Sequence, residues 1–166
     1  MNVLYAKTIL YSYITLEDVV LQIDELVERK ARSSFSNYSP AISQFESIIQ
    51  LTFEKDIIHA VKLVCDKILS KFSEEDLLFF RYKYFKNMSK KELSNFDFTS
   101  RAYFRKQVKL AQIFAHKLER NGIDDKFFEK NCLQLDFFRH LLKSSTEHEK
   151  LNYKNKPKTP KLNKKT

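Results

Sequence analysis

The sequence predicts an all-α protein, and two observations carry this prediction. Glycine occurs once and proline three times in 166 residues, which leaves few tight turns for a sandwich or barrel. Apolar residues make up 43% of the chain and recur at three- and four-residue spacing over most of its length. We therefore expect a long N-terminal helical hairpin, a small helix-turn-helix domain, and a C-terminal helix followed by a disordered basic tail.

The hairpin is expected within residues 1–72, where it could serve oligomerisation or partner docking. Residues 1–14 are apolar and aromatic, with some alternation between apolar and polar positions, which predicts either a strand or an extended arm packed across the helices. A helix is expected over residues 16–32, with Thr15 as its N-cap. A second helix over residues 40–71 would be roughly 45 Å long. It is longer than the first, so its remainder needs the C-terminal domain or a second subunit as partner.

Residues 73–122 have the order of a helix-turn-helix unit: a short helix, a second short helix, a turn and a longer basic helix. Ser73 is a cap for the first helix, and a Ser-x-x-Glu capping box at residues 89–92 opens the second. Thr99 can cap the last helix, and Gly122 is a stop signal at its end.

The last of these helices separates its charges from its apolar residues when stepped at roughly 100° per residue. One half of the wheel is basic and holds Arg101, Arg105, Lys106, Lys109, Lys117 and Arg120. The other half is apolar and is expected to face the core; it holds Tyr103, Phe104, Val108, Leu110, Ala111, Phe114, Ala115 and Leu118. A recognition helix needs one face of each kind.

The net charge of +9 is unevenly distributed along the chain. Residues 1–72 are nearly neutral at −1, whereas residues 73–122 and residues 123–166 each carry +5. The positive charge therefore begins where the helix-turn-helix pattern begins, which favours a polyanionic partner. A generally basic, solvated lysine surface is the other reading of the same charge.

The remainder of the chain adds a helix and a tail. Residues 123–143 keep a helical pattern, and residues 144–166 lose it and are expected to be disordered. Cys65 and Cys132 have no neighbouring cysteine, so buried reduced thiols are expected. The sequence has neither a signal peptide nor an apolar stretch of membrane-spanning length, and a cytoplasmic protein without a membrane partner is the simplest prediction.

No pattern points to catalysis, and we expect neither an enzyme nor a cofactor or metal site. A single glycine leaves no Gly-rich phosphate loop. The four histidines are far apart and fit no zinc spacing. The aromatic run over residues 79–85 could stack on single-stranded nucleic acid. Its helical spacing makes a core role the favoured reading.

The motifs of residues 73–120 resemble region 4 of bacterial sigma-70-type factors. They comprise the acidic start and core Glu74-Glu75-Asp76-Leu77…Arg81-Tyr82, then Ser89-Lys90-Lys91-Glu92-Leu93, then Thr99-Ser100-Arg101…Arg105-Lys106. In size and layout the chain is similar to sigma-like phage transcriptional regulators. Asp97 stands near the place where the family usually has a turn glycine. Nothing resembles sigma region 2, so promoter melting is not implied.

The resemblance implies sequence-specific binding of double-stranded DNA and transcriptional regulation in a phage, prophage or mobile element. The implied base contacts are Ser100, Arg101, Phe104 and Arg105. The phosphate contacts are expected at Lys90, Lys91, Lys106 and Lys109. The alternative is a non-enzymatic helical protein that docks on RNA polymerase or another protein, with a homodimer through the N-terminal helices as a further option.

Overall fold

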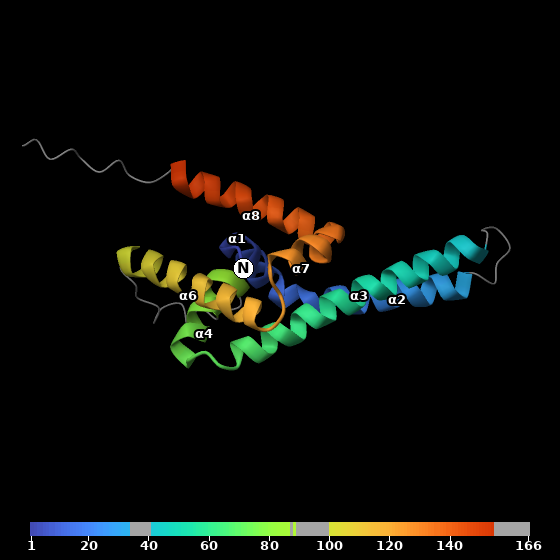
Figure 1. The fold of residues 1–166 in the computed structure, drawn as a ribbon, viewed down its shortest axis with the longest axis horizontal. Helices are drawn as coiled ribbons and strands as arrows, with labels where there is room; N and C mark the ends of the chain where they lie inside the picture. The colour runs from blue at the N-terminus through green and yellow to red at the C-terminus, as the bar shows by residue number, and fades with distance from the viewer. Residues whose placement is uncertain (34–40, 87, 89–99, 155–166) are drawn as a thin grey trace, which may run out of the picture.

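The computed structural model describes residues 1–33, 41–86, 88 and 100–154, and every regular element in these ranges is helical (Figure 1). The all-α class is thereby confirmed. The elements are α1 (Val3–Ser12), the 3-10 turn η1 (Tyr13–Thr15), α2 (Leu16–Ser33), α3 (Ala41–Leu69), α4 (Glu74–Phe80), the π turn η2 (Arg81–Phe85), α6 (Ser100–Arg120), α7 (Asp125–Lys130), the 3-10 turn η3 (Cys132–Gln134) and α8 (Asp136–Lys154). Within the described ranges, no helix combines the length and apolarity that a bilayer crossing needs.

The first helix lies at the centre of the molecule, so the strand or extended arm expected over residues 1–14 is wrong. α1 packs on both α6 and α8 (Figure 1). Its fully buried apolar residues are Ala6, Ile9 and Leu10. The buried hydroxyls of Thr8 and Ser12 donate to backbone carbonyls one turn back, at 2.9 and 2.8 Å. Because apolar residues occupy most of its circumference, α1 is buried on several sides, and such a helix shows no clean amphipathic period.

α2 and the first part of α3 lie side by side and project from the rest of the molecule (Figure 1). We call α2 together with residues 41–56 of α3 the arm, and the remaining helices the body. Ile23 is buried between the arm's helices, and Lys55 Nζ lies 2.7 Å from Asp24 Oδ1. The rest of α3 runs into the body.

One cluster of buried side chains joins the helices of the body, from α1 to α8. Its largest fully buried members are Ile9, Leu10, Leu16, Ile58, Val61, Ile68, Phe79, Phe80, Phe114, Leu118, Phe128 and Phe138. The aromatic run over residues 79–85 contributes Phe79, Phe80 and Tyr84 to this cluster, so the core reading of that run is confirmed. Ring contacts such as Phe72–Phe80, with centroids 5.0 Å apart, add edge-to-face packing.

Two of the expected helix boundaries are confirmed. Ser73 Oγ accepts a hydrogen bond from the Asp76 amide at 3.3 Å, as an N-cap should. Gly122, two residues after the end of α6, has φ of +88°, and the Ile123 amide donates to the Leu118 carbonyl at 3.0 Å. This is a Schellman ending, in which a left-handed residue closes the helix.

Two other boundaries differ from the expectation. Thr15 does not cap α2; its hydroxyl donates to the Ser12 carbonyl at 2.8 Å, because α1 continues into α2 through η1. α8 continues to Lys154, so the disorder expected from residue 144 is wrong for residues 144–154. Residues 155–166 and the second helix and turn of the expected helix-turn-helix, residues 89–99, lie outside the described residues.

Candidate nucleic-acid interface

α6 carries the candidate interface, and its inner face fixes its orientation. Leu110, Phe114 and Leu118 are buried in the common core, as the helical wheel predicts. Phe104 and Val108 are 59% and 52% exposed, so their expected place in the core is wrong. The N-terminal end of α6 lies at the outer edge of the molecule, beyond the ends of its neighbours (Figure 1). The wheel identifies the face correctly, but it carries no information on where the neighbouring helices end.

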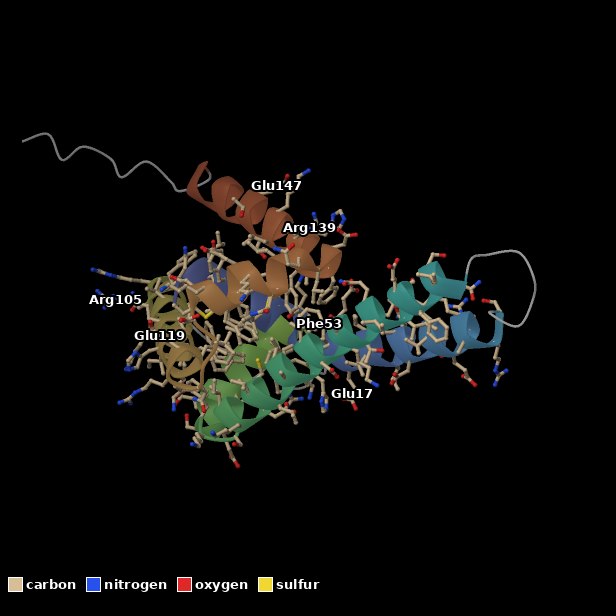
Figure 2. All side chains as sticks on the ribbon, turned by 45° about the vertical axis from the view of Figure 1, so that its right-hand side comes forward. Glu17, Phe53, Arg105, Glu119, Arg139 and Glu147 are labelled. Carbon is tan, nitrogen blue, oxygen red and sulfur yellow. The ribbon has the colours of Figure 1, made fainter. Side chains whose placement is uncertain are left out.

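Three exposed cations, Arg101, Arg105 and Lys109, form a stripe along this outer part of α6. We call them the basic stripe. A spacing of four residues places them on one side of the helix over roughly 12 Å. Figure 2 shows Arg105 pointing away from the body. Among the described residues, none of the three forms an ion pair with a carboxylate. The stripe therefore presents to solvent a positive charge that no described carboxylate compensates.

Lys106 lies on the same helix but faces the body. Its ammonium group pairs with Glu75 and lies 3.2 Å from Asp76 Oδ1, and only 16% of its side chain is exposed. Both carboxylates belong to the first turn of α4, where the helix dipole favours negative charge. Lys106 therefore links α6 to α4, and its charge is already compensated. We leave it out of the proposed phosphate contacts.

The other implied contact residues are placed as follows. Ser100 is the first residue of α6. Phe104 stands exposed beside Arg105, with its ring centroid 5.5 Å from that of Tyr103. Lys90 and Lys91 lie outside the described residues. The structure thus brings Arg101, Phe104, Arg105 and Lys109 to one outer end of α6.

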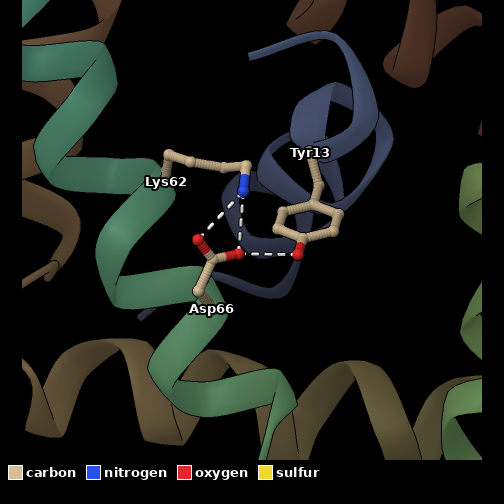
Figure 3. Close-up of polar contacts among 3 residues, drawn as sticks. All are labelled: Tyr13, Lys62 and Asp66. Atoms are coloured by element: carbon tan, nitrogen blue, oxygen red, sulfur yellow. Dashed lines mark hydrogen bonds and ion pairs between the residues drawn. The ribbon is translucent and has the colours of Figure 1, made fainter. Parts of the chain in front are cut away.

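A polar cluster between η1 and α3 was not anticipated from the sequence (Figure 3). Tyr13 Oη donates to Asp66 Oδ1 at 2.6 Å, and Lys62 Nζ lies 2.9 Å from both carboxylate oxygens of Asp66. The Lys62 ammonium also sits 4.9 Å from the centre of the Tyr13 ring. Burial, followed by the hydrogen bond to Asp66, raises the pKa of Tyr13 above its usual value. The phenol stays protonated and acts as a donor that fastens η1 to α3.

The two thiols are buried, as expected. Both Cys65 and Cys132 are fully enclosed and unpaired. Burial raises the pKa of Cys132 to about 12, and burial also raises that of Cys65. Neither thiol has the low pKa of a reactive cysteine. Over the described residues, no three His, Cys, Asp or Glu side chains gather in a way that could hold a metal ion.

The site stands on its own geometry. Comparison with known proteins adds no precedent: no protein-family model, no curated protein and no solved structure matches this chain.

Proposed function

We propose that the chain binds double-stranded DNA in a sequence-specific manner through the N-terminal half of α6, and that it regulates transcription in a phage, prophage or mobile element. The observation that carries the proposal is the basic stripe: Arg101, Arg105 and Lys109 are exposed, aligned and unpaired with described carboxylates at the outer end of a helix. The regulatory setting comes from the resemblance to sigma-70 region 4-like regulators.

The basic stripe has the composition and the size for a major groove. A guanidinium fork suits the O6 and N7 atoms of guanine, so Arg101 and Arg105 are the proposed base contacts. Phe104 can meet a thymine methyl group beside them. The Lys109 ammonium is a point charge suited to a backbone phosphate. A groove about 12 Å wide admits a helix, and this end of α6 projects beyond its neighbours (Figure 1).

The arrangement is unfavourable without a polyanion. Arg101–Arg105 and Arg105–Lys109 are like-charge pairs at i,i+4, and each costs about 0.2–0.5 kcal/mol in an isolated helix. A merely solvated helix face gains nothing from this arrangement and commonly alternates acidic with basic residues. DNA phosphates would relieve the repulsion, which favours the functional reading of the stripe.

The test begins with selection of bound fragments from random duplex DNA. Affinity for the selected site is then measured by fluorescence anisotropy for Arg101→Ala, Arg105→Ala and the matched control Arg29→Ala, which removes an exposed arginine from α2. Loss of one bidentate base contact should weaken binding by about 5- to 150-fold, equivalent to 1–3 kcal/mol. The control should bind like the wild type. Unchanged affinity in both α6 variants contradicts the assignment.

A second candidate function, docking on another protein, is favoured by an apolar stripe on the arm. Ile42, Phe45, Ile49 and Phe53 follow helical spacing along α3 and are 54–74% exposed. We call these four residues the arm stripe. Monomeric proteins rarely leave such a contiguous apolar surface uncovered. An amphipathic helix of a partner is the natural occupant, because it would bury its own apolar face against this one.

The negative charge of the arm indicates the charge that such a partner helix should carry. Residues 16–56 hold eight acidic and four basic residues, a net of −4. Glu46 and Asp56 are exposed on α3 close to the arm stripe. Two arms pairing with each other would bring like charges together, so the homodimer is the less favoured occupant. A helix with basic flanks, on RNA polymerase or another protein, fits best.

Synthetic helical peptides test this second candidate. A Leu-striped peptide with Lys flanks should bind the wild-type chain, and the same peptide with Glu flanks should not. The paired substitutions Ile49→Glu and Phe53→Glu change exposed residues, so folding should survive while peptide binding is lost. Light scattering over a range of protein concentrations checks for a second copy. Binding of neither peptide, or a dimer that the paired substitutions abolish, contradicts the proposed occupant.

A further inference from the structure

A hollow of about 160 Å³ lies where the C-terminal ends of α3 and α6 meet. It is lined by Lys67, Ile68, Lys71, Lys117, Arg120 and Asn121. Four of these six residues are cations, and no acidic residue lines the hollow among the described residues. We call these four the cation cluster. The volume is large enough for several water molecules, and so for a solvated anion.

The common core brings these four cations together. Ile68 and Leu118 are buried next to the hollow, and they fix the end of α3 against the end of α6. Lys67 and Lys71 are one turn apart along the chain, as are Lys117 and Arg120. Lys117 is held over the ring of Phe72, with its ammonium 5.2 Å from the ring centroid. The other three side chains are exposed.

Charges at helix ends explain only part of the cation cluster. Cations commonly sit at helix C-termini because the helix dipole places about −0.5 charge there. Two such ends supply about −1, against four positive side chains, which leaves about +3 uncompensated. One terminal carbonyl is also occupied, because Asn121 Nδ2 donates to the Lys117 carbonyl at 2.8 Å. The cation cluster is therefore in excess of what the helix ends require.

We propose that the hollow binds a phosphate group. This inference rests on the proposed function, which makes the group a backbone phosphate of duplex DNA. A free phosphate ion is the other source of the same chemistry. Arg120 follows Lys109 by eleven residues, which places it roughly 16 Å further along α6 and on the same side of the helix. The hollow thus extends the basic stripe to a second point, at a reach comparable to the ~12 Å width of a major groove.

The test uses the full chain with the double variant Lys71→Ala/Arg120→Ala. The control is Lys126→Ala/Lys130→Ala, which removes the same charge from exposed positions of α7. DNA affinity is measured from 50 to 200 mM salt on two unrelated duplexes. Loss of one phosphate contact should lower the slope of log K against log salt by about 0.9, which is about 3.5-fold over this range. The loss should be equal on both duplexes, because phosphates carry no sequence information.

A second arm separates the two sources of phosphate. Inorganic phosphate is titrated into wild-type protein and both double variants, and the amide NMR signals of Ile68 and Asn121, which line the hollow and are unchanged in every variant, are followed. A lowered salt slope in the double variant alone supports a DNA phosphate in the hollow. A free phosphate is supported by a different result. In that case the wild-type chain shows saturable shifts that only the double variant loses, while the salt slope is unchanged or the chain binds no DNA.

The proposal is overturned if the double variant shows neither effect relative to its control. That result leaves the proposed function intact when the wild-type chain still binds DNA and Arg105→Ala still weakens it. If the wild-type chain binds no duplex, the proposed function alone is contradicted. The phosphate titration then still tests whether the hollow binds phosphate.

Discussion

Separate replacement of Lys106 and Lys109 by alanine distinguishes a structural cation from a proposed DNA contact on the same helix. Lys106 is 16% exposed and pairs with Glu75 and Asp76, whereas Lys109 is exposed and has no described carboxylate partner. Both substitutions remove one positive charge from α6. A model based on net charge alone predicts the same effect for both. The contacts predict opposite behaviour in folding and in binding.

The expected magnitudes follow from these contacts. Exposed ion pairs contribute about 0.2–1 kcal/mol, and Lys106 should lie at the upper end because it is mostly covered and contacts two carboxylates. We expect Lys106→Ala to lower the free energy of unfolding by about 1 kcal/mol, without changing the salt slope of DNA binding. We expect Lys109→Ala to leave stability within about 0.5 kcal/mol of the wild type. It should lower the salt slope by about 0.9, because one phosphate contact is lost.

Urea unfolding followed by circular dichroism gives the stability, and fluorescence anisotropy at 50 and 200 mM salt gives the slope. The reasoning is refuted if Lys106→Ala lowers the salt slope as much as Lys109→Ala. In that case the ion pair to α4 opens on DNA, and the bound geometry differs from the one described. An unchanged slope for Lys109→Ala removes this residue from the interface.

Three further predictions concern the body. Gly122→Ala should destabilise the fold by about 1 kcal/mol in urea unfolding, because φ of +88° is strained for alanine although no atom lies within 4 Å of the added carbon. Tyr13→Phe should cost about 1 kcal/mol in the same assay, since the 2.6 Å hydrogen bond to Asp66 is lost while Lys62 keeps its own contact with that carboxylate. Burial raises the pKa of Cys132 from 9.0 to about 12, so this thiol should not react with Ellman's reagent at pH 8 until urea unfolds the chain. The unfolded thiol ionises at lower pH than the folded one, so the free energy of unfolding should fall as the pH rises from about 9 to 12. Rapid labelling of Cys132 in the native chain would contradict its burial.

The sequence predicts those features whose signal is local. Ser73 caps α4 and Gly122 ends α6, because capping depends on a few neighbouring residues. The inner face of α6 also follows from its period, because Leu110, Phe114 and Leu118 recur at helical spacing and meet a core. A helix with one apolar side can be recognised without knowing what covers it.

Features that depend on the neighbouring helices escaped prediction. α1 is enclosed on several sides, so its apolar residues show no period that separates a helix from a strand. Phe104 and Val108 lie on the apolar side of α6 but stay exposed, in the N-terminal half of a helix whose N-terminal end lies at the outer edge of the molecule (Figure 1). The cation cluster joins Lys67 and Lys71 to residues far along the chain, and no spacing in a single sequence shows that they meet.

The two candidate functions are compatible, because the charge of the chain is divided between the arm and the rest. Residues 16–56 carry −4 while the whole chain carries +9, so the residues outside the arm carry +13. A DNA duplex on α6 therefore attracts the body and repels the arm, which Figure 1 shows projecting away from α6. Repulsion from the duplex would keep the arm stripe open to a protein while the basic stripe is occupied. Substitutions in one stripe should then leave the other stripe's binding unchanged, which a single shared interface does not allow.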